Sequence, residues 1–129
     1  MFKKTIKKYL SNEIILFDES QDEDSNSLNY FRRSRIHWLY LLNLMQSYYE
    51  QKPITKSDLI HKIQVSHITI LKYIKESIVH NLVQEINSQV DKRKVILMPK
   101  DILISDFENY YYDHTREMKE LFEARQESS

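Results

Sequence analysis

The stretch "LIHKIQVSHITILKYI", residues 59–74, decides the fold because it contains two short helical patterns with a break between them. Its first leucine and the isoleucine four places later fall on one face of a helix. "QVS" at 64–66 interrupts this pattern, and Ser66 is a residue type that caps a helix by accepting a backbone N–H. Ile70 and Ile74 then resume the helical spacing. The stretch therefore predicts two helices joined by a tight turn.

Helical patterns continue upstream of this turn. Thr55 is a typical N-cap with an acid three residues later, so the first short helix should span about 56–63. Farther upstream, apolar and aromatic residues recur every three to four positions over 28–50. This spacing predicts one long helix, which stops before Pro53.

The spacing changes after Asn81. The helix capped by Ser66 should run to about His80, and Asn81 should take the left-handed conformation that ends it, because the chain has no glycine for this position. A partly alternating segment, a polar loop at 88–93 and a β-branched segment follow within 82–98. This order predicts a β-hairpin.

Two further segments complete the chain. A final helix is predicted over 99–124, opened by a proline whose missing N–H is not needed at that position. The first 27 residues are predicted to be an N-terminal arm and an acidic linker. Within the arm, 2–12 has the pattern of a short basic amphipathic helix, and 13–19 has a strand-like composition. The globular domain is expected to span 28–129.

This order of elements predicts a winged helix-turn-helix, mainly α with a small β-hairpin. Over about residues 30–125 the chain resembles the MarR-type transcriptional regulators. The likeness lies in "VSxxT" at the turn, in "NLV" at 81–83 where the family has Gly-Leu-Ile or Gly-Leu-Val, and in "DKR" at 91–93, which matches the wing motif Asp-x-Arg. The resemblance implies N- and C-terminal helices that join two subunits into a two-fold dimer.

Departures from the family pattern indicate a divergent member. Ile60 stands where helix-turn-helix sequences favour alanine, and Gln64 replaces the usual turn glycine. Ser77 lies where a core leucine is expected, with Ile78 available to take over that role. After the wing, "LMPKD" at 97–101 replaces the family's Leu-Thr-x-x-Gly.

The formal net charge of zero conceals a strong pattern along the chain. Residues 31–100 carry twelve basic and five acidic residues, a net of +7, whereas 101–129 carry three basic and eight acidic residues, a net of −5. Six acids and no base fall within 11–30. A basic middle between acidic segments fits a polyanion-binding core, and the alternative is an ordinary solvated surface.

Composition argues against several other classes of function. Without cysteine the chain has no disulfide or zinc finger, and without glycine it has no recognisable phosphate-binding loop or nucleophile elbow. The five histidines lack metal-ligand spacing, so we expect no metal, no cofactor and no enzymatic activity. No apolar run reaches the roughly 18 residues of a membrane span, which favours a cytoplasmic, nucleoid-associated protein.

A DNA-binding site is predicted on the second helix of the turn and on the hairpin. If Ile70, Ile74 and Ile78 pack inward, the opposite face offers donors and apolar groups to a major groove. Lys72 would neutralise a phosphate, and Leu71 would meet a thymine methyl unless it packs on a neighbouring helix. The predicted site residues are Ser66 (mainly as the cap), His67, Ile68, Thr69, Leu71, Lys72, Lys75, Asp91, Lys92, Arg93 and Lys94.

Arg93 is the strongest single candidate. A guanidinium at a hairpin tip can enter a narrow A·T-rich minor groove, and Asp91 is placed to orient it by a salt bridge. The alternative is that Arg93 is merely solvated. A further group of basic residues, Arg32, Arg33 and Arg35, was expected either to contact the DNA backbone or to pair with the acidic linker.

The sequence thus favours a homodimeric, sequence-specific regulator that binds double-stranded DNA and itself, without a membrane partner. It names no small-molecule effector. Two alternatives stay open: a winged-helix module that binds protein, and a phage- or replication-type DNA-binding protein that acts as a monomer. The aromatic stripes of the long helices favour a dimer, but they would also be covered if these helices packed on each other within one chain.

Overall fold

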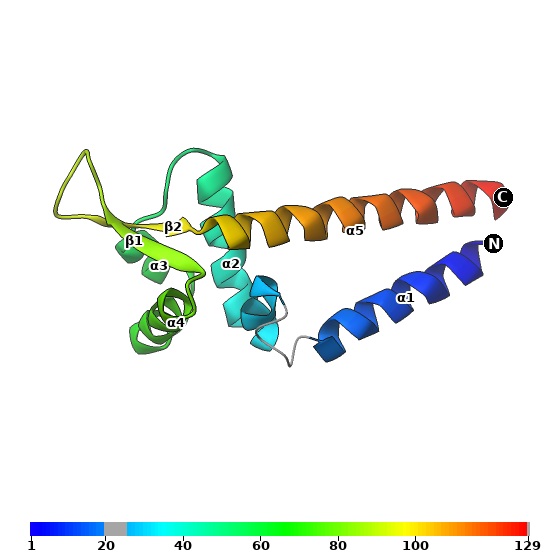
Figure 1. Ribbon diagram of the computed structural model, residues 1–129, viewed down its shortest axis with the longest axis horizontal. Coiled ribbons are helices and arrows are strands. Elements are labelled where there is room, and N and C mark those ends of the chain that lie inside the picture. The colour runs from blue at the N-terminus through cyan, green and yellow to red at the C-terminus, as the bar shows by residue number, and fades with distance from the viewer. Residues whose placement is uncertain (20–25, 129) are drawn as a thin grey trace.

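The computed structural model describes residues 1–19 and 26–128, and it consists of a compact body with a two-helix arm (Figure 1). The body contains the helices and the hairpin between residues 27 and 99, and the arm carries both chain termini at its far end. The elements are α1 (Phe2–Glu19), the 3-10 helix η1 (Ser27–Arg33), α2 (Arg35–Tyr49), α3 (Lys56–Lys62), α4 (His67–Val79), β1 (Val83–Asn87), β2 (Val95–Pro99) and α5 (Asp101–Ser128).

The helix-turn-helix is built as the sequence predicted. Thr55 caps α3 by accepting a hydrogen bond from the backbone N–H of Asp58 at 3.0 Å. Ser66 caps α4 in the same way, accepting from the N–H of Thr69 at 3.2 Å. Asn81 ends the helical segment with a φ of 60°, in the left-handed region where asparagine replaces glycine. These local hydrogen bonds fix where both helices begin and end.

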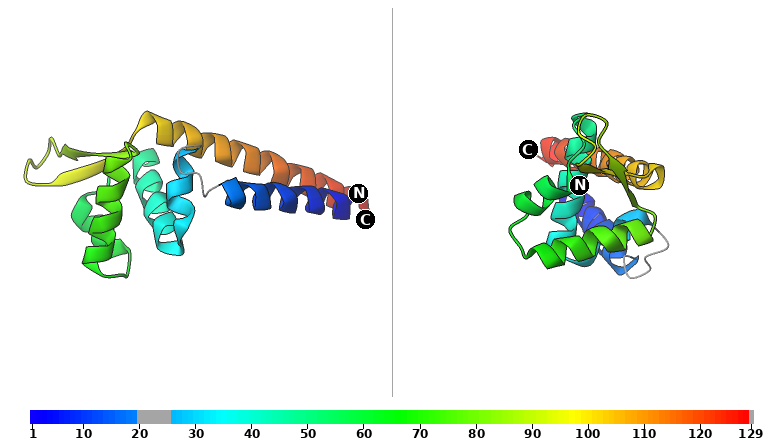
Figure 2. Two further views of the ribbon diagram at one scale, coloured as in Figure 1. Left: turned by 60° about the horizontal axis from the view of Figure 1, so that its bottom comes forward. Right: turned by 90° about the vertical axis from the view of Figure 1, so that its left-hand side faces the viewer.

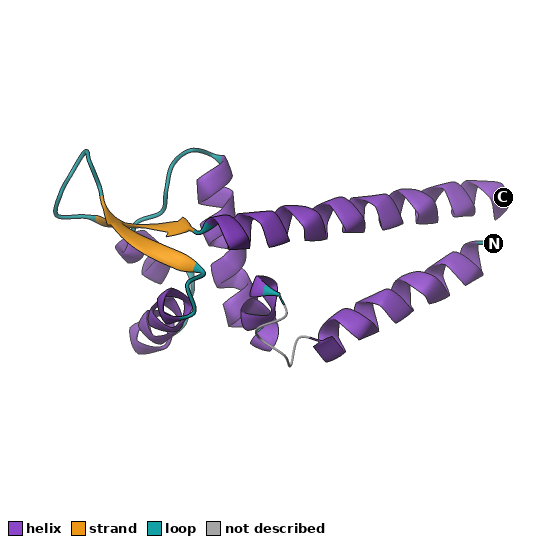
Figure 3. Cartoon of the chain, in the orientation of Figure 1, coloured by secondary structure: helices purple, strands orange, loops and turns teal. Residues whose placement is uncertain are grey.

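The hairpin pairs β1 with β2 in antiparallel register, with Val83 opposite Pro99 and Asn87 opposite Val95 (Figure 3). The prediction that Pro99 opens the last helix is therefore wrong. Its ring, which lacks an N–H, sits at the end of a strand, and the helix begins at Asp101. The loop before α3 adds to this sheet, because the backbone N–H of Leu97 donates to Ile54 O at 2.9 Å.

The single long helix predicted over 28–50 is instead two elements. Ser34 has an extended backbone, with φ −157° and ψ 168°, and its hydroxyl accepts a hydrogen bond from the backbone N–H of His37. This N-cap starts α2 at Arg35 and separates it from η1. The tighter 3-10 helix buries Leu28 and Phe31 in the core of the body.

The N-terminal segment is one continuous helix, so the strand-like composition of 13–19 was misleading. Residues 13–19 continue a helix whose preceding turns contact α5: Tyr9 Oη lies 3.2 Å from Nδ1 of His114, and the amide of Asn12 donates to Glu117 at 2.9 Å. α1 and α5 run side by side in opposite directions (Figures 1 and 2). Most of the predicted acidic linker lies outside the described residues, and the last helix continues to Ser128 rather than ending near 124.

The core of the body explains how Ser77 is accommodated where the MarR-type pattern has a leucine. Its side chain is fully buried, and its hydroxyl lies 2.8 Å from that of Tyr40 and donates to the carbonyl of Ile74 at 2.7 Å. A polar group in an apolar interior must be hydrogen-bonded, and here two hydroxyls satisfy each other. Ile78 stays half-buried at the edge and does not replace the expected leucine. In the described part of the chain, no helix is long and apolar enough to cross a membrane.

Candidate nucleic-acid interface

The α4 helix has one buried face and one exposed face. Ile70 and Ile74 are buried in the core, as the spacing predicted. On the opposite face Ile68 is 80% exposed and Leu71 is 40% exposed. Leu71 is therefore not fully covered by a neighbouring helix. Apolar side chains that face solvent beside exposed lysines are suited to a partner that offers both methyl groups and negative charge.

The predicted site residues on α4 divide into two groups. His67, Ile68, Leu71, Lys72 and Lys75 are exposed and face outward. Ser66 and Thr69 are occupied by the cap, because Ser66 accepts the Thr69 N–H and the two hydroxyl oxygens lie 2.9 Å apart. These two residues set the position at which the exposed helix begins.

The hairpin tip is held by its own side chains. Asp91 Oδ1 accepts the backbone N–H of Arg93 at 3.1 Å and lies 3.4 Å from its Nε, so the predicted salt bridge is present. Ser88 Oγ accepts the N–H groups of Val90 and Asp91 at 3.2 and 3.3 Å. Arg93 itself has a side chain that is 93% exposed. The tip therefore presents a guanidinium on a backbone that local hydrogen bonds have already shaped, with Lys92 and Lys94 exposed on either side.

A groove of about 460 Å³ connects the helix-turn-helix with the hairpin. It brings the predicted residue His67 together with Arg93 and Lys94, which are 26 or more positions away in sequence. Lys72 and Lys75 lie outside this groove, farther along α4. The full lining is Thr55, Lys56, Ser57, Asp58, Ile60, His61, His67, Arg93, Lys94 and Val95.

None of the DNA-binding residues predicted from the sequence lies on α3. The structure adds Lys56, Ser57 and His61 to the groove wall. Lys56 is fixed by an ion pair with Glu85 of β1 at 2.9 Å. The available signal was the helical spacing of polar residues opposite Leu59, but spacing alone does not show which element faces them.

Comparison with known proteins gives no match to any family model and no match among curated proteins. Solved structures do match. The S. aureus MepR–DNA complex aligns with a TM-score of 0.58 over 95% of this chain and 94% of that one, at 15% identity. The chain has the MarR-type winged-helix fold. Adhesin competence repressor (AdcR) from Streptococcus pyogenes aligns with a TM-score of 0.50 over 98% and 82% of the two chains, at 17% identity.

Within this fold, α4 is the second helix of the helix-turn-helix and the hairpin of β1 and β2 is the wing. Both lie at the end of the molecule opposite the chain termini (Figure 1), and the view along the arm shows them together (Figure 2, right).

Aromatic stacking locks α4 to the rest of the MarR-type body. The ring of His37 stacks on that of Tyr73 with centroids 3.8 Å apart, and its Nδ1 lies 2.6 Å from Ser34 Oγ. Burial, followed by the nearby Arg33 guanidinium, lowers the pKa of His37. Tyr30 donates to the carbonyl of Tyr73 at 3.0 Å, and burial raises the pKa of its hydroxyl. The contacts of Tyr73 with His37 and Tyr30 thus hold α4 against the neighbouring helices through neutral polar groups.

Two of the three arginines near the start of α2 pack on aromatic rings. The guanidinium of Arg32 lies 5.1 Å from the ring centroid of Tyr110 and donates to Asn29. That of Arg33 lies 5.0 Å from the centroid of Tyr30 and 3.9 Å from Glu76. Their contacts within the described residues are structural, and Arg35 remains exposed.

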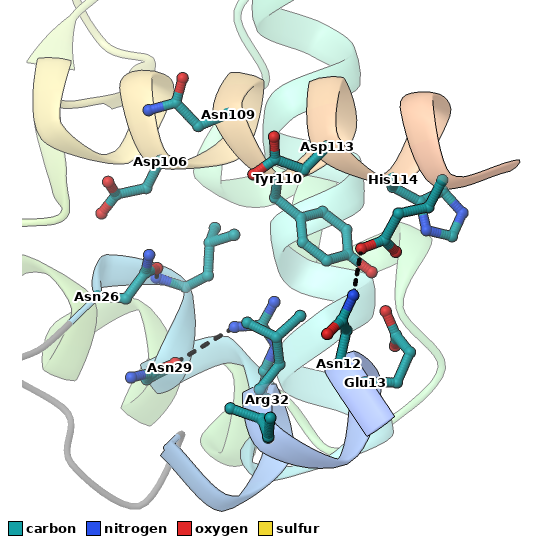
Figure 4. A pocket seen from close by; sticks show the side chains of 14 residues that line it. Asn12, Glu13, Asn26, Asn29, Arg32, Asp106, Asn109, Tyr110, Asp113 and His114 are labelled. Carbon is teal, nitrogen blue, oxygen red and sulfur yellow. Dashed lines mark hydrogen bonds between the residues drawn. The ribbon is translucent and has the colours of Figure 1, made fainter. Parts of the chain in front are cut away.

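A second cavity of about 430 Å³ lies between α1, η1 and α5, at the junction of the arm and the body (Figure 4). Its wall is mostly polar, and Asp106 accepts both the N–H and the hydroxyl of Ser27 at 2.9 and 2.6 Å. Asp113 and Glu13 also line it. None of the predicted DNA-binding residues lies in this wall.

Proposed function

We propose that this protein is a homodimeric transcription regulator that binds double-stranded DNA with sequence preference. The observation that carries this proposal is the pairing of two features at one end of the molecule: the exposed face of α4 and the arginine-tipped wing. The likeness in fold to MepR, which was solved with DNA, and to AdcR, which is a repressor, supports it. Regulation of chromosomal genes would place the protein in the cytoplasm, at the nucleoid.

In this proposal α4 enters the major groove. His67 at the start of the helix donates to a base edge or a phosphate, and Ile68 and Leu71 meet thymine methyl groups. Lys72 and Lys75 neutralise phosphates on the two sides of the groove. Ser66 and Thr69 act through the cap, which fixes how deeply the first turn of α4 can enter.

The wing enters the adjacent minor groove. Arg93 is suited to this because its side chain is almost wholly solvated in the free protein, so contact with DNA requires no rearrangement of the core. A narrow A·T-rich minor groove concentrates negative potential, which attracts a guanidinium. Asp91 orients Arg93, and Lys92 and Lys94 contact the phosphates on either side.

Dimerisation is assigned to the arm. Within one chain α5 packs on α2, through ring contacts of Trp38 with Tyr110 and of Tyr49 with Phe107, and it also packs on α1. Both α1 and α5 nevertheless leave large apolar side chains in solvent. Ile14 is 61% exposed, Tyr112 70% and Phe122 64%. Scattered exposed apolar residues are ordinary, but two adjacent helices that share such a surface favour a second copy of the chain. A two-fold dimer would set the two α4 helices to meet half-sites about one helical turn apart, roughly 34 Å.

The decisive experiment is a DNA-binding titration across salt concentration. If several phosphates are neutralised, the logarithm of the affinity should fall linearly with the logarithm of salt, with a slope of about −0.9 for each contact. A selection from random duplexes should return a palindromic site. A flat salt response would favour the protein-binding module, and a site without two-fold symmetry would favour the monomeric DNA-binding protein.

A further inference from the structure

We propose that the groove between α3 and the wing binds one phosphodiester of the DNA backbone, and that it binds this group more tightly when His61 carries a proton. DNA binding would then take up a proton at this residue. The inference rests on the proposed DNA-binding function and adds a site to it. It concerns a residue of α3, outside the recognition helix and the wing.

The position of the groove follows from the geometry of a duplex. If α4 lies in the major groove and Arg93 lies in the adjacent minor groove, the sugar–phosphate strand that separates those grooves must pass between them. The cleft of about 460 Å³ occupies that place, since His67 of α4 and both Arg93 and Lys94 of the wing contribute to its wall. His61 and Ser57 of α3 form the wall that faces them.

The hydrogen bond of His61 determines what its ring can offer a phosphate. Nδ1 lies 2.7 Å from the backbone carbonyl oxygen of Ser57. A carbonyl oxygen only accepts, so Nδ1 must carry a hydrogen, and in the neutral ring Nε2 then has a lone pair. A phosphodiester oxygen also has only lone pairs. A neutral His61 that keeps its bond to Ser57 therefore cannot donate to phosphate through Nε2, whereas the imidazolium can keep that bond and donate as well.

Charged groups on three elements surround this ring. On α3 itself Lys56 and Asp58 flank it, with Lys56 already paired with Glu85. On α4 the ring of His67 lies 6.2 Å away between centroids. The wing contributes Arg93 and Lys94. Apart from Asp58 and Glu85, the charged neighbours are cationic, so a phosphate that enters the groove meets positive charge from α3 and from the wing.

Proton uptake follows from the thermodynamic coupling between DNA binding and the protonation of His61. A ligand that binds the protonated form better than the neutral form must raise the number of bound protons, and its affinity must rise as pH falls. Each proton taken up changes the affinity by up to about tenfold per pH unit. Imidazole is the side chain that exchanges a proton between about pH 5 and 8, so the effect would fall within that range.

The test uses the full-length protein and one high-affinity duplex at fixed salt, with affinity measured by fluorescence anisotropy from pH 6 to 8. His61→Gln, His61→Lys and the wild type are compared. A matched control is His80→Gln, the same substitution at an exposed histidine at the end of α4 that lies outside the groove lining. Calorimetry in two buffers of different ionisation enthalpy counts the protons taken up, and thermal unfolding confirms that each variant is folded.

The wild type and His80→Gln should gain affinity on acidification with the same slope. In the wild type His61 should contribute up to about a tenfold gain in affinity per pH unit of acidification. His61→Gln should lose this contribution, because its amide donates a hydrogen bond without first binding a proton. His61→Lys should bind at pH 8 at least as tightly as the wild type and take up fewer protons. If His61→Gln keeps the slope and the proton uptake of the wild type, the proposed phosphate site is wrong while DNA binding stands. If the folded wild type binds no duplex at any pH, the proposed function fails with it.

Discussion

Replacing Arg93 with alanine should weaken binding to the preferred site without affecting the fold. Its side chain is 93% exposed, so truncation removes no buried contact and leaves no unsatisfied core group. In the complex the guanidinium would lose its contacts in the minor groove. A base- or groove-reading arginine is worth on the order of 1–3 kcal/mol, or about 5- to 150-fold in affinity. The loss should be larger on sites with A·T-rich flanks than on scrambled duplexes.

Asp91→Ala should give a smaller loss of the same kind. The Asp91–Arg93 pair has an N–O distance of 3.4 Å and is largely in water, and exposed pairs of this type contribute about 0–1 kcal/mol. Asp91 also accepts the backbone N–H of Arg93, so its removal loosens the tip as well as the side chain. The double variant should lose only slightly more than Arg93→Ala alone, because Asp91 acts mainly through the Arg93 side chain and only its bond to the backbone of the tip remains to be lost.

The assay is a fluorescence-anisotropy titration of the wild type, the two single variants and the double variant. Each protein is measured on one selected duplex and one scrambled duplex, at two salt concentrations. Circular dichroism should show the same helix content for all four proteins. If Arg93→Ala leaves both affinity and flank preference unchanged, the wing does not contact DNA in the way proposed, and the protein-binding alternative becomes the better hypothesis.

Other changes test separate parts of the molecule. Lys72→Ala should weaken binding to all duplexes alike and reduce the magnitude of the salt slope by about one unit in anisotropy titrations, since it removes a phosphate contact. Phe122→Glu should convert a dimer into a folded monomer in light scattering, whereas Glu120→Gln should not; an unchanged dimer mass would contradict the assignment of the arm. The lowered pKa of His37 means that the unfolded chain binds this proton more readily than the folded chain. Stability should therefore be full above about pH 6.5 and fall as pH drops toward the lowered folded pKa, and His37→Phe should reduce that loss in thermal unfolding scans.

Local chemistry made the centre of the chain predictable. Thr55, Ser66 and Asn81 each act within a few residues of their own position, through a side-chain hydrogen bond or a left-handed backbone. Such interactions involve only residues close together in the sequence, so they can be predicted without knowledge of any distant partner. The salt bridge between Asp91 and Arg93 was predictable for the same reason, because the two residues lie two positions apart in one turn.

The remaining features depend on contacts between distant parts of the chain. The place of α1 along α5 depends on residues 105 positions apart, such as Tyr9 and His114. Ser77 is tolerated in the core because Tyr40, on another helix, provides its hydrogen-bond partner. His61 belongs to the groove only because the wing folds back beside α3. The sequence alone determined the caps, the turn and the order of elements, since these rest on short-range hydrogen bonds and periodicity. Tertiary packing decided which faces are covered and which charges converge, because those depend on the positions of residues far apart in sequence.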